Sequence, residues 1–391
     1  MRAPSAMALF CVACWPALAP AAFDPTDAFQ VNVNVGFNHD SNLFRIPDVD
    51  PRLFGINPEN KSDTAFIKGV GVKFDKVVSR QRFIADLNVN ETTFDKNTRL
   101  DYNGYDGHLA WMWRIGNDWD GEASYRKRKT LGGFSDEFLK LQDLVISEYY
   151  RFAAGYQLDA RWRVSGEIGK EDQSHSAINR QSQDLDAKYA GLDVTYRTPS
   201  DNSIGLIARR TDRDYPSGPL TSVLNNSTED RINLVGIWRL TGITRLDLQA
   251  GYVDVTHDQA PPRDFSGSTW RAGVTWDASG KFRLTAAGYK DIRLYEDRET
   301  DFILVHGVSI IPLYAVTSKI ALQGEFVYEN REFEPLSPRE DKFRLAKLGV
   351  TYTPIRNVDL TLSFEVGDRK SNIPINNYDY QAWFGTAKIS F

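Results

Sequence analysis

The sequence predicts an all-β protein: a transmembrane antiparallel up-and-down β-barrel of about eighteen strands in the bacterial outer membrane. Three observations predict it: segments that alternate apolar and polar residues, connections that alternate between short and long, and an amphipathic segment that ends on a terminal phenylalanine. Apolar membrane helices are disfavoured, because 25% of the residues are charged and the mean hydropathy is −0.42.

Alternation of apolar and polar residues begins at residue 29. Residues 29–37 place Phe or Val at every second position, which is the period of a strand with one apolar face. About eighteen such segments follow one another, each about 9–11 residues long, the length of a tilted membrane-spanning strand. The segment 302–311 is apolar at both parities, so its facing is left unassigned.

The connections between these segments are alternately short and long. Short turns are predicted at residues 115–118, 158–160, 198–201, 241–243 and 277–280. Long polar loops are predicted at residues 41–62, 129–142, 171–184, 211–229 and 295–301. Short turns at one end and long loops at the other are typical of outer-membrane barrels, whose short turns face the periplasm.

The N-terminus predicts a secretory signal peptide over residues 1–21, so the barrel is expected to occupy residues 22–391. Arg2 precedes an apolar run over 6–19, and residues 19–21 fit an A-x-A cleavage site. Both cysteines, Cys11 and Cys14, lie in this segment. A disulfide framework or a cysteine metal site in the mature chain is therefore excluded.

The C-terminal segment alternates up to Phe391, with Trp383, Gly385, Ala387 and Ile389 on the same parity. It resembles the C-terminal signature that the barrel assembly machinery reads, so Phe391 is the expected assembly signal. The alternative is an edge strand that ends on Phe by chance. Barrel assembly machinery and outer-membrane lipid are the partners that this interpretation implies.

A strand-built membrane protein must close on itself, because lipid offers no partner for backbone N–H and C=O groups. Barrels of about sixteen to eighteen strands leave an aqueous channel. Aromatic residues near the segment ends suit the interfacial girdles of such a barrel. They are Trp111, Trp113, Trp119, Tyr125, Trp162, Tyr196, Trp238, Trp270, Trp276 and Trp383.

Basic residues outnumber acidic residues on the polar parity, which is expected to line the lumen. The candidate substrate-path residues are Arg126, Arg161, Arg163, Arg209, Arg231, Arg245, Arg271 and Arg283. Many acidic residues fall instead in or near the expected loops: Asp48, Asp50, Glu171, Asp172, Asp212, Asp214, Glu296, Asp297, Glu299, Glu332 and Glu334. A basic lumen would concentrate anions. Alternatively, each Arg pairs with a neighbouring acid and only stiffens the wall.

The sequence does not support enzyme activity, metal binding or nucleic-acid binding. There is no G-x-S-x-G elbow, phosphate loop or H-E-x-x-H motif, and the five His are scattered. We therefore expect no catalytic residues, no metal and no cofactor. A net charge of −5 does not suggest nucleic acid.

The element Asp40-Ser41-Asn42-Leu43-Phe44-Arg45 ends the first strand. With a barrel of this size, it resembles the outer-membrane proteins of exopolysaccharide operons, the EpsL type found beside PEP-CTERM/exosortase systems. The resemblance implies a role in exopolysaccharide biosynthesis and export. The alternative is that the element is only a turn at the end of the strand, in which Asn42 favours the turn and Phe44 is an apolar anchor.

Three functions follow as alternatives. The first is an outer-membrane pore that passes a polysaccharide, expected to be anionic, through the basic lumen, with a periplasmic export protein as partner. The second is a general or weakly anion-selective diffusion porin for small solutes. The third is a closed structural or adhesive barrel that binds ligands through its long loops.

Overall fold

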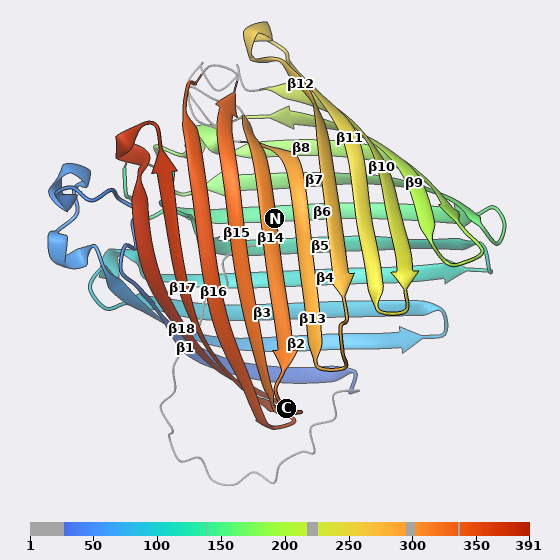
Figure 1. The fold of residues 1–391 in the computed structure, drawn as a ribbon, viewed down its shortest axis with the longest axis horizontal. Coiled ribbons are helices and arrows are strands. Elements are labelled where there is room, and N and C mark those ends of the chain that lie inside the picture. The colour runs from blue at the N-terminus through green and yellow to red at the C-terminus, as the bar shows by residue number, and fades with distance from the viewer. Residues whose placement is uncertain (1–26, 138, 217–225, 295–301, 335–336) are drawn as a thin grey trace.

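Eighteen strands form one antiparallel sheet that closes on itself in the computed structural model (Figure 1). Each strand pairs with its neighbours in sequence, and β1 pairs with β18 from Asn32↔Ser390 to Asp40↔Ala382. The structure describes residues 27–137, 139–216, 226–294, 302–334 and 337–391. The predicted signal segment 1–21, the predicted loop 295–301 and part of the loop 211–229 lie outside these residues.

The strands are β1 Phe29–Asp40, β2 Asp63–Val78, β3 Gln81–Phe94, β4 Tyr102–Ile115, β5 Trp119–Leu131, β6 Leu144–Gln157, β7 Trp162–His175, β8 Leu185–Arg197, β9 Ser203–Asp214, β10 Ser227–Thr241, β11 Thr244–His257, β12 Phe265–Trp276, β13 Phe282–Leu294, β14 Phe302–Ala315, β15 Ile320–Glu334, β16 Glu340–Ile355, β17 Val358–Ser371 and β18 Tyr378–Ser390. The helical segments are 3-10 turns: Pro51–Phe54, Pro58–Asn60, Thr98–Leu100, Gln181–Gln183, Pro261–Arg263 and Pro374–Asn376. Within the described ranges, no helix has the length and apolar character to cross a membrane.

The predicted fold class and strand number are confirmed, but the strands are longer than expected. They run to 12–16 residues, because their polar ends continue the sheet toward the long loops. Six acidic residues expected in loops therefore lie in β7, β9 and β15: Glu171, Asp172, Asp212, Asp214, Glu332 and Glu334. Asp48 and Asp50 lie in loop 41–62 as predicted, and Glu296, Asp297 and Glu299 are outside the described residues.

The outward face of the barrel is apolar, and it carries the aromatic residues that the sequence assigned to girdles. Trp119 packs on Tyr156 and Trp162 on Tyr196 at the short-turn end, with ring centroids 4.8 and 4.9 Å apart. Large exposed apolar side chains on nearly all the strands would be anomalous in water. They are the expected surface of a barrel in lipid.

The facing of β14, which the sequence left open, is settled by its pairing. Val308 and Ile310 are exposed on the outward face, whereas Ile303 and Val305 are buried on the inward face. The inward pair packs with Tyr289 and Phe333 near the long-loop end. Both parities are apolar because Val308 and Ile310 face lipid while the other parity fills this inner cluster; Phe302, on the parity of Val308, is itself buried with Val253 and Val255.

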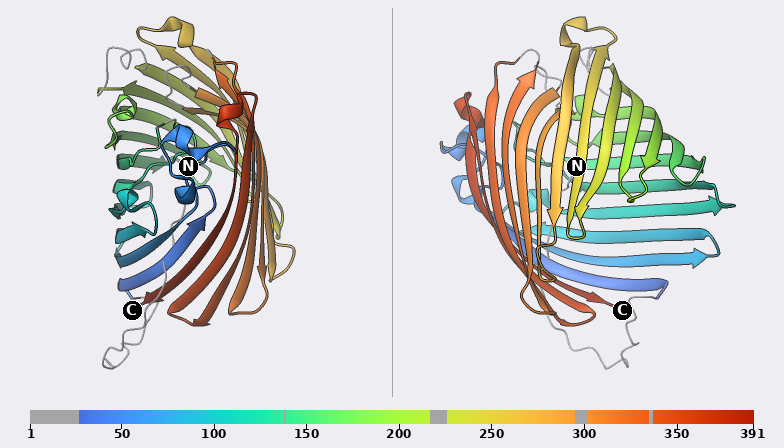
Figure 2. Two further views of the ribbon diagram at one scale, coloured as in Figure 1. Left: turned by 90° about the vertical axis from the view of Figure 1, so that its left-hand side faces the viewer. Right: turned by 45° about the vertical axis from the view of Figure 1, so that its right-hand side comes forward.

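The two walls of the barrel cross at a large angle (Figure 2), and the 3-10 turns of loop 41–62 lie beyond the strand ends, at the left of Figure 1. In the left-hand view of Figure 2 this loop, drawn in blue, is seen against the space between the two walls. The connections β1–β2, β3–β4 and β5–β6 lie at one end of the barrel and include the long loops. The turns at the other end are only a few residues long. We call these ends the long-loop end and the short-turn end.

Candidate functional site

The long-loop end is narrowed by two loops that fold inward. Phe44 and Ile46 of loop 41–62 are buried with Phe134 of loop 132–143. The rings of Phe44 and Phe134 have centroids 5.0 Å apart. The same cluster includes Ala65 and Phe94 on the inner wall, so both loops are held to β2 and β3 by apolar packing.

The element 40–45 is a tightly bonded turn at the start of this plug. The Asn42 side-chain amide donates to the carbonyls of Ile46 and Asp379 at 2.8 and 2.9 Å, and its oxygen accepts from the Ile46 N–H. Arg45 forms an ion pair with Asp40 and lies over the Tyr380 ring, 3.5 Å from its centroid. The turn reading of this element, with Asn42 in the turn and Phe44 as an anchor, is confirmed.

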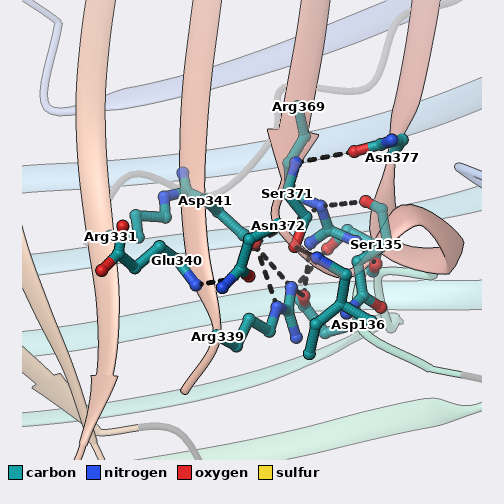
Figure 3. A network of polar contacts seen from close by, with 12 residues as sticks. Ser135, Asp136, Arg331, Arg339, Glu340, Asp341, Arg369, Ser371, Asn372 and Asn377 are labelled. Atoms are coloured by element: carbon teal, nitrogen blue, oxygen red, sulfur yellow. Dashed lines mark hydrogen bonds and ion pairs between the residues drawn. The ribbon is translucent and has the colours of Figure 1, made fainter. Parts of the chain in front are cut away.

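Loop 132–143 leaves β5 and reaches the opposite wall (Figure 3). The Asp136 carboxylate accepts hydrogen bonds from Arg339, at 3.0 Å, and from Arg369. The Ser135 carbonyl accepts from Arg369 as well, at 2.5 Å. Arg369 lies on β17 and Arg339 precedes β16, and these are the sixth and seventh strands around the wall from β5, so the loop crosses the lumen.

A second carboxylate, Asp341 of β16, completes this network. Arg339 donates to both Asp341 oxygens, at 3.1 and 2.6 Å, and Asp341 is 1% exposed. The Arg369 Nε lies 3.7 Å from the same carboxylate. Two guanidinium groups are therefore balanced by one carboxylate fixed in the wall and one carried by the loop.

A small cavity of about 180 Å³ lies at this crossing. Its charged lining residues are the cations Arg45, Lys140, Arg339 and Arg369 and the acids Asp136 and Glu137. Burial alone would raise the pKa of Asp136, but the Arg369 and Arg339 guanidiniums outweigh it and hold the pKa at about 2. Burial and the nearby Arg369 charge lower the pKa of Lys140 to about 8.

The wall behind the cavity carries cations stacked on aromatic rings, which we call the basic-aromatic wall. Each pair has its cation within 3.5–4.5 Å of a ring centroid: Arg45 on Tyr380, Arg331 on Phe343, Arg339 on Phe333, Lys347 on Phe384 and Arg369 on Tyr378. A stacked guanidinium keeps its N–H edge free for a planar anion. Gly367 permits the stack, because a Cβ there would lie 2.4 Å from the Tyr380 ring.

The predicted substrate-path arginines lie along the rest of the barrel, and most are ion-paired. The pairs are Arg126–Asp106, Arg163–Asp120, Arg209–Glu167, Arg231–Glu229, Arg245–Asp247 and Arg283–Asp277. Arg163 reaches Asp120 across Gly155, where a Cβ would lie 2.1 Å from its guanidinium. This arrangement favours the alternative in which the arginines pair with acids along the wall.

Two predicted residues differ from the others. Arg161 lies in the turn before β7, where its backbone N–H donates to Asp159, rather than on a strand face. Arg271 lies 5.3 Å from the centroid of the Tyr289 ring, and no ion pair joins it to a carboxylate of the described residues. Phe391 is exposed, and its backbone exchanges two hydrogen bonds with Val31.

The residues that meet at the constriction were not among the predicted set. Arg369 shares the inward parity of Asp359 and Glu365, and Arg331 that of Glu325, so extending the strand pattern to the strand ends would have found them. Asp136, Lys140 and Arg339 lie in loops, where period two gives no facing. No group of three or more potential metal-ligand side chains occurs within the described residues.

Comparison with known proteins points to porins. Residues 225–389, which include every residue of the basic-aromatic wall except Arg45, match the model of a family described as "Putative beta-barrel porin 2". No curated protein matches the sequence. The match covers less than half of the chain, so it supports a porin-like character for the C-terminal strands.

Solved structures of outer-membrane porins share the whole fold. The outer-membrane protein OpdK of Pseudomonas aeruginosa superposes with a TM-score of 0.52 at 11% identity, covering 93% of this chain and 99% of that chain. OccK2 (OpdF) of the same organism gives 0.54 at 9%, covering 93% and 98%. A BenF-like porin of Pseudomonas fluorescens Pf-5 gives 0.52 at 11%, covering 93% and 99%.

These comparisons decide part of the functional prediction. Porins are channels, which agrees with the expectation that the chain is not an enzyme. The family and the solved structures named above are not described as exopolysaccharide proteins, so they do not support the EpsL-type resemblance. The chain is therefore a porin-like β-barrel with the fold of outer-membrane porins.

Proposed function

We propose that the protein is a diffusion porin for small anionic solutes, with carboxylates as the preferred class. The observation that carries this proposal is the constriction, where loop 132–143 meets Arg339 and Arg369 across the lumen. Cations outnumber acids in its lining. An anion passing through this end meets charge-assisted donors where the loop crosses the lumen.

The size of the cavity favours a small solute over a polymer. At about 180 Å³, it is smaller than the roughly 300–1,000 Å³ of pockets that hold drug-sized ligands. A polysaccharide strand would need loop 132–143 to leave the lumen together with loop 41–62. Loop 41–62 is anchored by the buried Phe44 and Ile46 and by the Asn42 hydrogen bonds, which opposes such a movement.

Carboxylates suit the geometry best. Arg339 and Arg369 present planar N–H edges, which match a carboxylate better than a halide. The solved structures of similar fold include OpdK with vanillate and OccK2 (OpdF) in complex with glucuronate, and both ligands are carboxylates. The neighbouring rings of Phe333 and Tyr378 offer an apolar surface for the body of such a solute.

In this proposal the long-loop end faces the exterior and the short-turn end the periplasm. The outward apolar face contacts outer-membrane lipid, residues 1–21 direct export, and Phe391 serves the barrel assembly machinery. A diffusion porin needs no periplasmic export partner. The basic-aromatic wall continues below the cavity with Lys347 on Phe384, which extends the anion path into the lumen.

The test is single-channel recording of the refolded protein in a planar bilayer with a potassium chloride gradient. The proposal predicts a reversal potential with the sign of anion preference and a conductance that benzoate reduces. The variant Arg210→Gln removes a cation that pairs with Asp230 on the outward face, and it should leave the reversal potential unchanged.

Three results would redirect the assignment. A cation-preferring or unselective channel that benzoate does not affect would contradict the anion path. Block by acidic oligosaccharide at concentrations where benzoate has no effect would return the assignment to polysaccharide export. No conductance in samples that show the heat-modifiable gel mobility of a folded barrel would favour a closed barrel that acts through its loops.

A further inference from the structure

We propose that Arg339 and Arg369 form a carboxylate-binding site whose resident occupant is Asp136 of the protein's own loop. A solute carboxylate binds by replacing Asp136, and this releases the tip of loop 132–143 from the opposite wall. The inference rests on the proposed function, because it names the site at which an anionic solute is recognised and couples that site to opening of the constriction.

Charge balance at the crossing identifies the site. Asp341 accepts a two-point hydrogen bond from Arg339 and lies near Arg369, so it compensates one of the two guanidiniums. Asp136 compensates the other. If Asp136 leaves, the two guanidinium charges share the single carboxylate of Asp341, and an incompletely compensated charge in a largely buried place is costly. An incoming carboxylate removes that cost.

The two carboxylates differ in how firmly they are held. Asp341 belongs to the β15–β16 and β16–β17 ladders, opposite Arg331 and Ser371, and its side chain is fully buried. Asp136 lies in a loop that begins at Gly132 and Gly133, and its side chain is 27% exposed. A solute in the cavity can therefore reach and displace Asp136 but not Asp341.

The loop is built so that its tip can move while its base stays in place. Its base is closed by the Gly132 N–H bonded to the Asp143 carbonyl at 2.7 Å and by Phe134 packed on Phe44. Lys140 Nζ donates to the Phe134 carbonyl at 2.7 Å, which ties the two arms together. Contacts with Arg339 and Arg369 come from the tip residues Ser135 and Asp136.

Several features make a carboxylate the expected ligand class. The site already holds a carboxylate in a geometry that joins two guanidiniums through one oxygen. Lys140 and Arg45 line the same cavity and add positive charge. The stacked rings of Phe333 and Tyr378 hold both guanidiniums in orientation without using their N–H donors.

The tethered Asp136 must weaken solute binding by competition. An apparent dissociation constant equals the intrinsic one divided by the fraction of time that the site is free. If Asp136 occupies the site about nine-tenths of the time, its removal strengthens carboxylate binding about tenfold. The competition also keeps release fast, because Asp136 returns as the solute leaves.

The experiment compares benzoate block of single-channel current in wild type, Asp136→Asn and Asp136→Ser, with benzamide as the neutral analogue. We expect about tenfold lower half-blocking benzoate concentrations in both variants and no effect of benzamide. Arg369→Gln in the Asp136→Asn background should abolish the gain. The matched control is Asp50→Asn, a carboxylate of loop 41–62 that pairs with the exposed Arg52 and is not part of the cavity lining.

Movement of the loop is measured separately with Ser135→Cys, since the only natural cysteines are Cys11 and Cys14 in the predicted signal segment. Benzoate should accelerate modification of this thiol by a water-soluble methanethiosulfonate several-fold, and benzamide should not. Heat-modifiable gel mobility verifies folding of every variant.

The outcomes separate this site from the proposed function. An anion-selective channel whose benzoate block is the same in wild type and both Asp136 variants would overturn the site and leave the porin assignment intact. The site would also be overturned if Asp136→Asn still lowered the half-blocking benzoate concentration when Arg369→Gln is present. A channel without anion preference in which Asp136→Asn still gains benzoate block would support the site and contradict the anion-selective path.

Discussion

Asp40 and Arg45 are joined by a two-point ion pair, with Nη–Oδ separations of 2.9 and 2.7 Å. The pair closes a turn in which Arg45 has a positive φ of 53°, a conformation that disfavours residues other than glycine. Stacking of Arg45 on Tyr380 joins the turn to β18. The strained backbone is therefore held by side chains from both ends of the chain, and loop 41–62 begins from a fixed point.

The first prediction concerns Asn42, whose amide satisfies the backbone of this turn. Asn42→Ala leaves the buried carbonyls of Ile46 and Asp379 without their donor, at a cost of roughly 1–3 kcal/mol for each unpaired group. Amide exchange of the peptide around residues 41–47 should accelerate by about thirtyfold, the equivalent of about 2 kcal/mol. The measurement is hydrogen exchange by mass spectrometry of the refolded barrel.

The control for this prediction is Asn57→Ala. Asn57 also caps a backbone N–H of loop 41–62, that of Glu59, but at an exposed site where water can replace it. In Asn57→Ala, amide hydrogen exchange should change only within the 3-10 turn Pro58–Asn60. Equal acceleration of residues 41–47 in both variants would mean that the loop opens as a whole and that Asn42 does not anchor it.

The barrel could be predicted from the sequence because lipid imposes one rule on every strand. A side chain that faces lipid must be apolar, and the residues before and after it in the strand face the lumen. Residues such as Phe83 and Trp111 therefore show the facing of their strand from the local sequence alone. β14 resisted this reasoning, since its inward residues Ile303 and Val305 are apolar for a second reason, packing on Tyr289 and Phe333.

The constriction could not be predicted in the same way. Contact between Asp136 and Arg369 spans 233 positions in sequence and depends on where a loop folds, which no period encodes. Parity placed Arg163 and Asp120 on the inward face but did not pair them, because they lie on β7 and β5 and their contact depends on register. Arg245 and Asp247 lie two residues apart on β11, so they share a face by parity alone. The sequence thus indicated a polar lumen, and its charge balance follows from the three-dimensional pairing.

The second prediction is that anion preference falls with rising pH through Lys140. Burial and the Arg369 charge lower its pKa to about 8, below its ordinary value of 10.5. Below about pH 8 the ammonium is charged and its burial costs folding free energy, and that cost is relieved as pH rises from about 8 toward 10.5. Reversal potentials measured from about pH 7 to about pH 9 should therefore shift toward cation preference.

Lys140→Gln provides the comparison for this pH dependence. The variant should show at pH 7 the weaker anion preference that wild type shows at pH 9, and its reversal potential should be flat between these values. The Phe134 carbonyl retains a donor in the Gln amide, so the loop is expected to keep its place. A wild-type reversal potential that is constant over the range would show that Lys140 does not face the ion path.

The third prediction separates paired from unpaired lumen arginines. Arg163→Gln leaves Asp120 without its cation, so the wall gains an uncompensated negative charge and selectivity shifts toward cations. Arg163→Gln combined with Asp120→Asn removes both charges and should restore the wild-type reversal potential. Arg271→Gln removes a cation that has no acidic partner among the described residues, so no second substitution at a neighbouring acid is available to compensate it.

These variants test the hypothesis that Arg161, Arg163, Arg245, Arg271 and Arg283 set anion preference. Paired residues are predicted to act through the acids that they neutralise, and Arg271 through its own charge. If the double variant at Arg163 and Asp120 shifted the reversal potential as far as the single variant, the pair would not act as a neutral unit. The measurement is the zero-current potential in a tenfold salt gradient.

The fourth prediction concerns Phe391, which the sequence predicts to be the assembly signal. Its backbone N–H donates to Val31 at 2.7 Å and its carbonyl accepts from Val31 at 3.0 Å, whereas its side chain is 56% exposed. Phe391→Ala keeps both backbone bonds and removes only an exposed ring. Refolding of the purified variant into detergent should therefore equal that of wild type, while the folded, heat-modifiable fraction in outer membranes of producing cells should fall several-fold.

The control is Trp383→Ala, which removes an outward aromatic ring from β18. The ring centroids of Trp383 and Phe364 are 4.5 Å apart, so this variant is expected to impair refolding and membrane assembly together. A parallel loss in both assays for Phe391→Ala would assign the residue a structural role, because recognition by assembly machinery operates only in the cell.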